Sequence, residues 1–235
     1  MDLRQVNSRE KTPRYGLGVL MKRQYAFTLV EIIVVISIVV LTAIILIPNI
    51  IDDNKKLHTI SQWKHTYKNI EYVFSAIKAQ ATETDKIAIE KTRTNDEREV
   101  VLYDLLNPYF RMQTQVDAKT YKTYFMDGSF INEKSDYYFK NLHTTSSGMI
   151  IGVKWLLPPS KAQNSLPIAM MSIDLNGAKR PNKWGQDIFG VNIFLDRIQP
   201  LGEEFDEMLA KSDCSKKGKG ISCSAYYNNY GGRLN

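Results

Sequence analysis

Residues 27–51 form an apolar segment of 25 residues that contains a single charged side chain, Glu31. Because about 20 apolar residues at roughly 1.5 Å rise per residue cover the hydrocarbon core of a bilayer, the segment predicts a transmembrane helix. A carboxylate at the centre of such a helix costs on the order of 2.5–3.5 kcal/mol on insertion scales. Glu31 therefore needs a partner. A charged residue at this place leads to the hypothesis that Glu31 has a functional role.

The residues on either side of the apolar segment indicate its orientation. Lys22 and Arg23 precede it, and a long polar region follows it. The positive-inside rule then holds the short N-terminal side in the cytosol and places the later region outside the cytoplasm. An ordinary secretory signal peptide has an apolar region of about 7–15 residues, so this segment is too long for one. We expect a single-pass membrane protein.

The start of the segment carries a recognisable motif, MKRQYA followed by FTLVE, from Met21 to Glu31. It resembles the class III leader of type IV pilins and type II secretion pseudopilins, in which a short basic leader and a small residue precede Phe-Thr-Leu-(Ile/Val)-Glu. The resemblance implies that a prepilin peptidase cuts between Ala26 and Phe27 on the cytosolic face and that the new Phe27 amine is N-methylated. Ala26, which is also small, stands where the family usually has Gly.

Pro48 lies 22 residues into the chain that this cleavage would leave. Proline removes a backbone hydrogen bond and bends a helix, and in the pilin family a proline at this offset marks where the helix kinks or melts as subunits pack. The resemblance assigns Glu31 and Pro48 to assembly, with Glu31 pairing with the methylated Phe27 amine of an adjoining subunit. It also implies other copies or other pilin-like subunits as partners, an inner-membrane assembly platform, and a final place in an extracytoplasmic or cell-surface fibre.

The net charge of +6 is concentrated before the apolar segment. Residues 1–26 carry six basic and two acidic side chains, which leaves residues 27–235 with +2. So mild a charge does not argue for nucleic-acid binding. Residues 2–20 lack apolar periodicity and are predicted to be disordered. We expect Met21 to be the working start, with a six-residue leader; a start at Met1 is the alternative.

After Pro48 the sequence becomes polar, and apolar residues then recur at spacings of three and four, as on one face of an amphipathic helix. The apolar segment and this stripe are predicted to form one helix from about residue 27 to residue 81, with the stripe packed on a sheet. The stripe consists of Leu57, Ile60, Trp63, Tyr67, Ile70, Phe74 and Ile77.

Beyond this helix, residues 100–110 are consistent with a short helix that ends near Pro108. The hydrophobic period then changes towards two, which is typical of strands. Four strands are predicted, the first two of them joined as a hairpin: 137–142, 149–156, 169–175 and 188–196.

These elements predict an α+β, pilin-like fold in which a long N-terminal transmembrane helix packs on an antiparallel sheet of about four strands. The expected organisation is a cleaved leader (1–26), a transmembrane and polymerisation helix (27–51), an amphipathic continuation of that helix (52–82) and an extracytoplasmic globular pilin-like domain (83–235). The resemblance implies a structural subunit of a type IV pilus or type II secretion pseudopilus that assembles through its N-terminal helix.

The two cysteines, Cys214 and Cys223, both follow the span and so face an oxidising compartment, where such a pair usually forms a disulfide. By loop entropy a closure this short contributes roughly 2–3 kcal/mol. A zinc site would need further His or Cys nearby, and the sequence has neither between residues 144 and 235 apart from this pair. Many pilins have a C-terminal disulfide loop of this kind.

The turn-rich stretch from Asp174 to Asp187 is a candidate cation site. Asp174, Asn176 and Asp187 offer the oxygen ligands that calcium prefers, but the EF-hand spacing fails because its twelfth position is Gly185 instead of a bidentate Glu. Self-capped turns are the alternative, because Asx side chains cap turn amides. No other cofactor is expected.

The remaining motifs do not indicate an enzyme, because the sequence has no Ser-His-Asp arrangement with supporting context, no glycine loop after a strand and no Cys-x-x-Cys. The competing function is a single-span membrane-anchored extracytoplasmic binding protein, including a minor pilin for DNA uptake. Lysines beside aromatic residues could contact DNA, although solvated loops explain them equally well. The basic residues are Lys179, Arg180, Lys183, Lys216, Lys217 and Lys219, with Tyr226, Tyr227 and Tyr230 close by.

Overall fold

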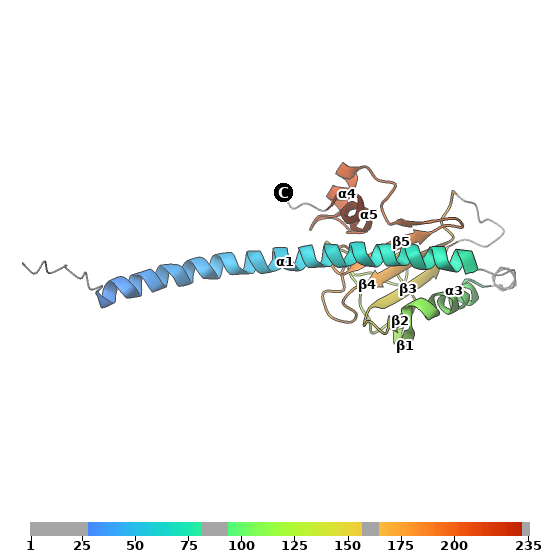
Figure 1. Ribbon diagram of the computed structural model, residues 1–235, viewed down its shortest axis with the longest axis horizontal. Helices are drawn as coiled ribbons and strands as arrows, with labels where there is room; N and C mark the ends of the chain where they lie inside the picture. Colours follow the sequence, from blue (N-terminus) through green and yellow to red (C-terminus); the bar gives the residue numbers. More distant parts are fainter. Residues whose placement is uncertain (1–27, 81–93, 157–164, 232–235) are drawn as a thin grey trace, which may run out of the picture. The chain divides into compact units, whose positions relative to one another are not determined.

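The computed structural model describes residues 28–80, 94–156 and 165–231, without the side chains of residues 48–53. The chain divides into two units, residues 1–49 and 50–235, and α1 (Leu29–Gln80) contributes to both. The other helices and strands follow in the order α3 (Asn95–Phe110), β1 (Met112–Asp117), β2 (Asn141–Thr145), β3 (Ile150–Trp155), β4 (Ala169–Asp174), β5 (Ile188–Ile193), β6 (Ile198–Pro200), α4 (Glu207–Asp213) and α5 (Cys223–Asn229) (Figure 1).

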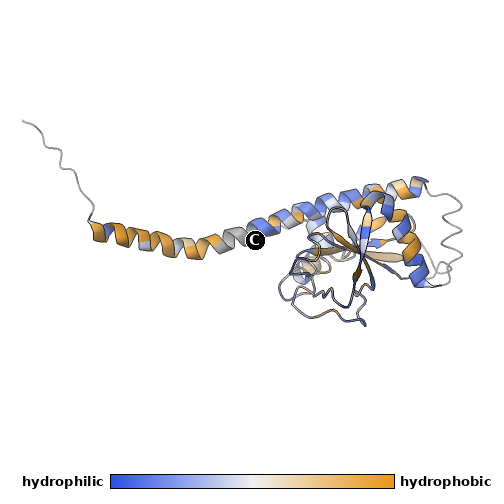
Figure 2. Ribbon diagram, turned by 90° about the horizontal axis from the view of Figure 1, so that it is seen from below, coloured by the Kyte–Doolittle hydropathy of each residue, from blue (hydrophilic) through white to orange (hydrophobic). Residues whose placement is uncertain are grey.

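In the first unit, the stretch Leu29–Ile47 of α1 is long and apolar enough to cross a membrane. Figure 2 shows that it is hydrophobic on all sides. Its large apolar side chains are exposed from Leu29 to Ile47. A helix that is apolar all round needs an apolar environment from outside its own fold, as a membrane or a bundle of other helices provides.

The sheet has six antiparallel strands in the order β1-β2-β3-β4-β5-β6, so each strand pairs with its neighbour in sequence. The prediction of an α+β fold with an antiparallel sheet is confirmed, but the expected number of about four strands is wrong. The two additional strands are the edges, β1 and β6. β1 (MQTQVD) is almost entirely exposed and β6 has three residues ending in Pro200. β1 buries none of its side chains fully, and β6, in which Ile198 and Pro200 are buried, is too short for an alternating pattern to identify it.

The interior strands follow the sequence pattern closely. β3, β4 and β5 lie within the predicted ranges 149–156, 169–175 and 188–196. β2 is displaced, because it spans Asn141–Thr145 where residues 137–142 were predicted. The physical reason is that Phe139 is buried in loop structure against the sheet, so its apolar signal belongs to a loop.

The second part of α1 packs on one face of the sheet, as the stripe predicts. Trp63 has no exposed surface, and its ring stacks on Phe189 of β5 with centroids 4.9 Å apart. Leu57 is an exception to the prediction, because 52 % of its surface is exposed. The side chains of α1 in this core are Ile60, Trp63, Tyr67, Ile70 and Val73, with Phe74 and Ile77 partly buried beside them.

Helix α3 packs on the same side and begins with a capping box. Thr94 accepts a hydrogen bond from Glu97 N at 3.2 Å, and the Glu97 side chain accepts one from Thr94 N at 3.2 Å. Pro108 lies inside the helix, which ends at Phe110, two residues beyond the expected end, and Arg111 follows in the left-handed conformation.

Two side chains of α3 complete the hydrogen bonding of β3 at and beyond its last pair with β2, Asn141 with Val153. The Tyr103 hydroxyl accepts from Val153 N at 2.8 Å and donates to Asn141 O at 2.6 Å. Glu99 accepts from Trp155 N at 2.9 Å and from Asn141 Nδ2 at 2.6 Å. Buried backbone groups need such partners, so α3 is tied to the sheet by polar as well as apolar contacts.

The opposite face of the sheet is covered by loops. Gly152, Ser172 and Gly190 lie side by side on β3, β4 and β5 in the strand register. A Cβ at Gly152 would meet Phe139, and one at Gly190 would meet Trp184. These small residues let two aromatic rings lie directly on the sheet, where they form a second apolar cluster.

Candidate functional site

The start of α1 is organised by a hydrogen-bonded pair, Thr28 and Glu31. Glu31 Oε2 accepts from Thr28 N at 2.8 Å and from the Thr28 hydroxyl at 2.9 Å, and Thr28 Oγ1 accepts from Glu31 N at 3.2 Å. This is a capping box, which satisfies helix donors that have no partner within the helix. Both bonds to the carboxylate use Oε2, so Oε1 accepts no hydrogen bond from a described residue.

The capping box was not predicted, although the sequence contained its signal. Thr-x-x-Glu directly before an apolar run is the usual pattern for it, and the motif FTLVE includes Thr28 and Glu31 at that spacing. The carboxylate is thus fixed near the helix start by a local contact. That contact leaves one oxygen for a second partner.

The rest of the apolar stretch offers little other polar chemistry. Ser37 Oγ donates to Ile33 O at 2.8 Å, and Thr42 Oγ1 donates to Ile38 O at 3.0 Å. Hydroxyl groups bonded to their own helix are satisfied without an outside partner. Among residues 28–47, Glu31 is therefore the one charged group.

The other predicted processing and assembly residues are placed only in part. Ala26 and Phe27 lie outside the described residues. Pro48 lies within α1, which runs as one helix from Leu29 to Gln80. Cleavage at Phe27 and the role of Pro48 in subunit packing stay predictions.

Residues 21–47 match the family model of the prokaryotic N-terminal methylation motif. The chain carries a prepilin-type signal. This is the signal of type IV pilins and pseudopilins, so the resemblance seen at Met21–Glu31 is confirmed. The prepilin-type signal includes the capping box and ends at the last residue of the stretch that could span a membrane. No curated protein and no solved structure matches the chain.

The predicted disulfide is present, with Cys214 and Cys223 bonded at 2.02 Å between their sulfur atoms. It joins the end of α4 to the start of α5. The loop that it closes is organised by Asp213, which accepts hydrogen bonds from Lys219 N at 2.9 Å and Ser222 N at 2.8 Å. Sequence reasoning did not identify Asp213, because its bonds span up to nine residues and follow no local motif.

The candidate calcium ligands lie close together, between the last residue of β4, Asp174, and Asp187, which directly precedes β5. Asp187 accepts hydrogen bonds from Asn182 N at 2.8 Å, Lys183 N at 2.6 Å and Asn176 Nδ2 at 3.1 Å. Asp174 accepts from Asn176 N at 3.0 Å. The described residues contain no group of three or more His, Cys, Asp or Glu suited to a metal ion. Both carboxylates already act as turn caps, and calcium binding stays a prediction.

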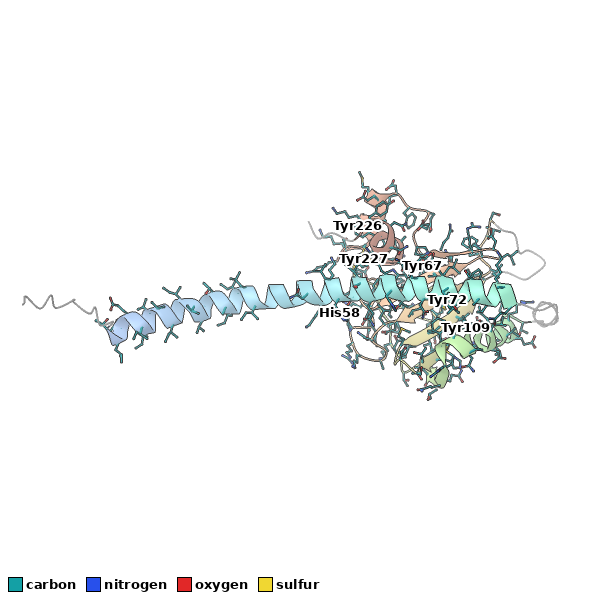
Figure 3. All side chains as sticks on the ribbon, viewed as in Figure 1. His58, Tyr67, Tyr72, Tyr109, Tyr226 and Tyr227 are labelled. Atoms are coloured by element: carbon teal, nitrogen blue, oxygen red, sulfur yellow. A yellow bond between two sulfur atoms is a disulfide. The ribbon has the colours of Figure 1, made fainter. Side chains whose placement is uncertain are left out.

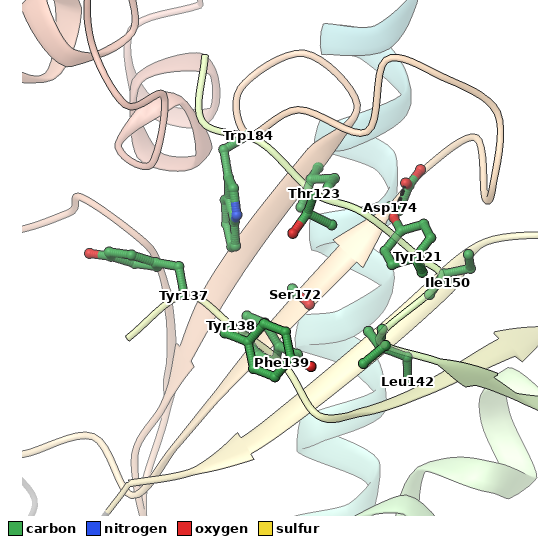
Figure 4. A pocket seen from close by; sticks show the side chains of 12 residues that line it. Tyr121, Thr123, Tyr137, Tyr138, Phe139, Leu142, Ile150, Ser172, Asp174 and Trp184 are labelled. Carbon is green, nitrogen blue, oxygen red and sulfur yellow. Dashed lines mark hydrogen bonds between the residues drawn. The ribbon is translucent and has the colours of Figure 1, made fainter. Parts of the chain in front are cut away.

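Asp174 also meets Tyr121, whose hydroxyl donates to its second carboxylate oxygen (Figure 4). Asp174 and Asp187 are buried, and burial raises the pKa of both, that of Asp174 to about 8. The hydrogen bonds to each carboxylate act in the opposite direction and are outweighed by the loss of water. The cavity that Tyr121 and Asp174 line with Ser172 and Trp184 has a volume of about 20 Å³, which is room for one water molecule rather than a substrate.

A larger, open groove of about 880 Å³ lies between the start of α3, β1 and the loop before β2. Its walls include Asp96 and Lys140, which form an ion pair of 2.9 Å with both side chains exposed. Tyr138 and Trp155 add aromatic surface. The volume falls in the range of small-molecule sites, about 300–1,000 Å³.

The predicted basic clusters meet at one loop. Lys183 and Lys219 both lower the pKa of Asp127 by their charge, after the larger effect of its hydrogen bonds from Ser129. Tyr226 and Tyr227, labelled in Figure 3, are buried in the core, so they are not available to stack on bases. Tyr230 is exposed, so DNA contact stays a prediction that would depend on the lysines and Tyr230.

Proposed function

We propose that this chain is a structural subunit of a type IV pilus or a type II secretion pseudopilus. It waits in the inner membrane with its N-terminus in the cytosol, is trimmed by a prepilin peptidase, and enters a helical fibre through the first part of α1. The observation that carries the proposal is the single carboxylate, Glu31, held near the start of an apolar helix within the prepilin-type signal at residues 21–47.

The energetics of assembly give Glu31 its role. Moving an apolar helix from lipid into a fibre core gains little hydrophobic free energy, so packing and polar contacts must set the register. The capping box holds Oε2 of Glu31, and Oε1 is left for a cation. The Phe27 amine of the adjoining subunit stays cationic after methylation and supplies that partner. A charge pair with so little water around it gives specificity.

The second unit is consistent with a subunit displayed outside the cytoplasm. The disulfide between Cys214 and Cys223 requires an oxidising compartment to form and persist. The packing of Trp63 on Phe189 joins the second part of α1 to the sheet. The second part of α1 therefore belongs to the globular domain.

The decisive experiment is the mass of the mature chain in the membrane fraction of cells with the cognate machinery. Intact-mass measurement should give a chain that starts at Phe27 with the added mass of one methyl group. Shear-released fibres should contain the same species. A mature chain that still carries Tyr25 and Ala26 would contradict the proposal.

The competing function is a membrane-anchored binding protein that does not polymerise, and the open groove beside Tyr138 favours it as the second candidate. A plain anchor is not cut after Ala26 and does not enter fibres. The same two measurements therefore separate the two functions.

A further inference from the structure

An exposed segment after β6, residues 203–209, which includes the first turn of α4, combines acidic and apolar side chains. All seven of its residues are exposed, and the sequence EEFDEML carries four carboxylates. Met208 exposes 81 % of its surface and Leu209 57 %, and Phe205 lies beside them. A cluster of exposed apolar side chains rimmed by charge marks an interaction surface. We call residues 203–209 the acidic segment.

The acidic segment is fixed in place although its side chains are exposed. Asp206 caps α4 by accepting from Leu209 N at 2.8 Å, and Glu203 accepts from Asn229 Nδ2 at 2.6 Å. Glu204 and Glu207 form no hydrogen bond or ion pair with any described residue. Two carboxylates are thus presented to solvent on a preformed scaffold, which lowers the entropy cost of binding.

The outer face of α1 has the complementary character. Residues 54–72 carry four lysines and one carboxylate, Glu71. Lys64 and Lys68 form no ion pair with any described residue, and Leu57 and Tyr72 are exposed beside them. The side chains that share this face by helical spacing, which we call the basic face, are Leu57, Ser61, Lys64, His65, Lys68, Glu71 and Tyr72, so that two of the four lysines and the one carboxylate lie on it (Tyr72 is labelled in Figure 3).

We propose that the acidic segment of one copy binds the basic face of α1 in the next copy. The net charges are of opposite sign, and each surface adds exposed apolar side chains: Met208 and Leu209 on one, and on the other Leu57 or Tyr72, which lie about 22 Å apart along α1. This proposal rests on the proposed fibre function and names a second contact within it, between globular domains.

The two surfaces lie on different elements of the same domain (Figure 1). Each copy in a fibre can therefore use its acidic segment towards one neighbour and its basic face towards another. Such a heterologous interface generates an open helical assembly when the rotation between neighbouring copies does not close a ring. The contact is consistent with a fibre and limits how neighbouring domains are ordered along it.

Charge reversal tests the contact in the full-length chain with its assembly machinery. We expect Glu204→Lys with Glu207→Lys to lower the ratio of fibre-associated to membrane-resident subunit about tenfold, the effect of roughly 1.4 kcal/mol. Lys64→Glu with Lys68→Glu should do the same. Combining all four changes exchanges the charges of the two surfaces, so that they attract each other again. This fourfold variant should recover most of the ratio.

The matched control reverses two exposed carboxylates elsewhere, Glu133→Lys with Asp136→Lys, and should leave the ratio at the wild-type value. An equal loss in the control, or no recovery in the fourfold variant, would overturn the proposed contact. If the wild-type chain itself formed no fibres, the proposed function would fail instead, so the two failures are distinct.

Cross-linking gives a second test that does not depend on fibre yield. Ser61→Cys with Met208→Cys should give a ladder of oligomers in sheared fibres after mild oxidation, because each copy then links to two others. A product that stops at the dimer would indicate a closed, isologous contact and contradict the proposal. Val100→Cys on α3 with Met208→Cys is the control and should give no ladder.

Discussion

Trp63 on α1 lies between two other parts of the domain. Its ring stacks on Phe189 of β5 at 4.9 Å with the planes 17° apart, and its Nε1 donates to Ser224 O of α5 at 2.9 Å. One side chain thereby connects the helix, the sheet and the C-terminal region that the disulfide closes.

The first prediction follows from that position. Trp63→Ala should lower the free energy of unfolding by about 3–5 kcal/mol, because it removes a fully buried aromatic side chain. Trp63→Phe should cost less, because it keeps an aromatic ring against Phe189 and loses the bond to Ser224 O. Urea unfolding followed by far-UV circular dichroism measures both. Equal stability of Trp63→Ala and the wild type would contradict the packing.

The second prediction concerns the disulfide. Peptide mapping without reductant should recover Cys214 linked to Cys223 from exported protein. Replacing both with alanine should destabilise the domain by roughly 2–3 kcal/mol, the loop-entropy value for a closure of this length. Two thiols that react with an alkylating reagent in freshly isolated native protein would contradict the bond and the outward topology together.

The third prediction concerns pH. The pKa of Asp174 in the fold is about 8, raised by burial from its ordinary value of 3.8. The folded chain therefore keeps a proton that the unfolded chain releases, so stability is full below about pH 4 and falls as the pH rises towards 8. Asp187 acts in the same direction, because burial raises its pKa too.

Asp174→Asn should flatten this dependence. The slope that it removes is at most about 1.4 kcal/mol per pH unit, the value for one proton. Asn keeps an acceptor for Tyr121 and has no charge to bury. Unfolding midpoints measured from pH 5 to pH 9 test this, with Asp136→Asn, an exposed residue, as the control. An unchanged slope in Asp174→Asn would show that this carboxyl does not titrate there.

Burial along a helix could be predicted from the sequence, but the place where the helix meets the sheet and the edges of the sheet could not. Spacing predicted the burial of Trp63 and Tyr67, because helical period depends only on local geometry. It did not predict the exposure of Leu57, because the period does not say where the sheet beneath a helix begins. The edge strand β1 was missed since an edge can pair through its backbone without burying alternate side chains, and β6 was missed because three residues are too few to show a period.

Among the candidate sites, contiguous motifs could be read from the sequence, whereas residues that only folding brings together could not. The prepilin-type signal was readable because its residues are contiguous, and the Thr28–Glu31 box could have been read from the same letters. Glu99, Tyr103 and Asp213 could not be identified, because each bonds to backbone that only the folded chain brings near. Asp174 and Asp187 both accept hydrogen bonds around Asn176 in the fold, but their use as turn caps depends on amides that the sequence does not position.

The last prediction separates two roles of Glu31, capping its own helix and pairing with a neighbouring subunit. Glu31→Leu removes both the cap and the charge. It should leave membrane insertion intact or improved, because a charge leaves an apolar segment, while the ratio of fibre-associated to membrane-resident subunit falls. Glu31→Gln is the matched variant, because glutamine can still complete a capping box but carries no charge.

If the carboxylate pairs with the Phe27 amine of the next subunit, Glu31→Gln should assemble as poorly as Glu31→Leu. Thr28→Val, which removes the cap and keeps the charge, should lose only about 1 kcal/mol of helix stability and assemble nearly normally. The measurement is the fibre-to-membrane ratio of each variant, with leader cleavage and membrane levels checked to be equal. Normal assembly of Glu31→Gln beside poor assembly of Glu31→Leu and Thr28→Val would assign Glu31 to helix capping, and the register of the fibre would then have to come from other contacts.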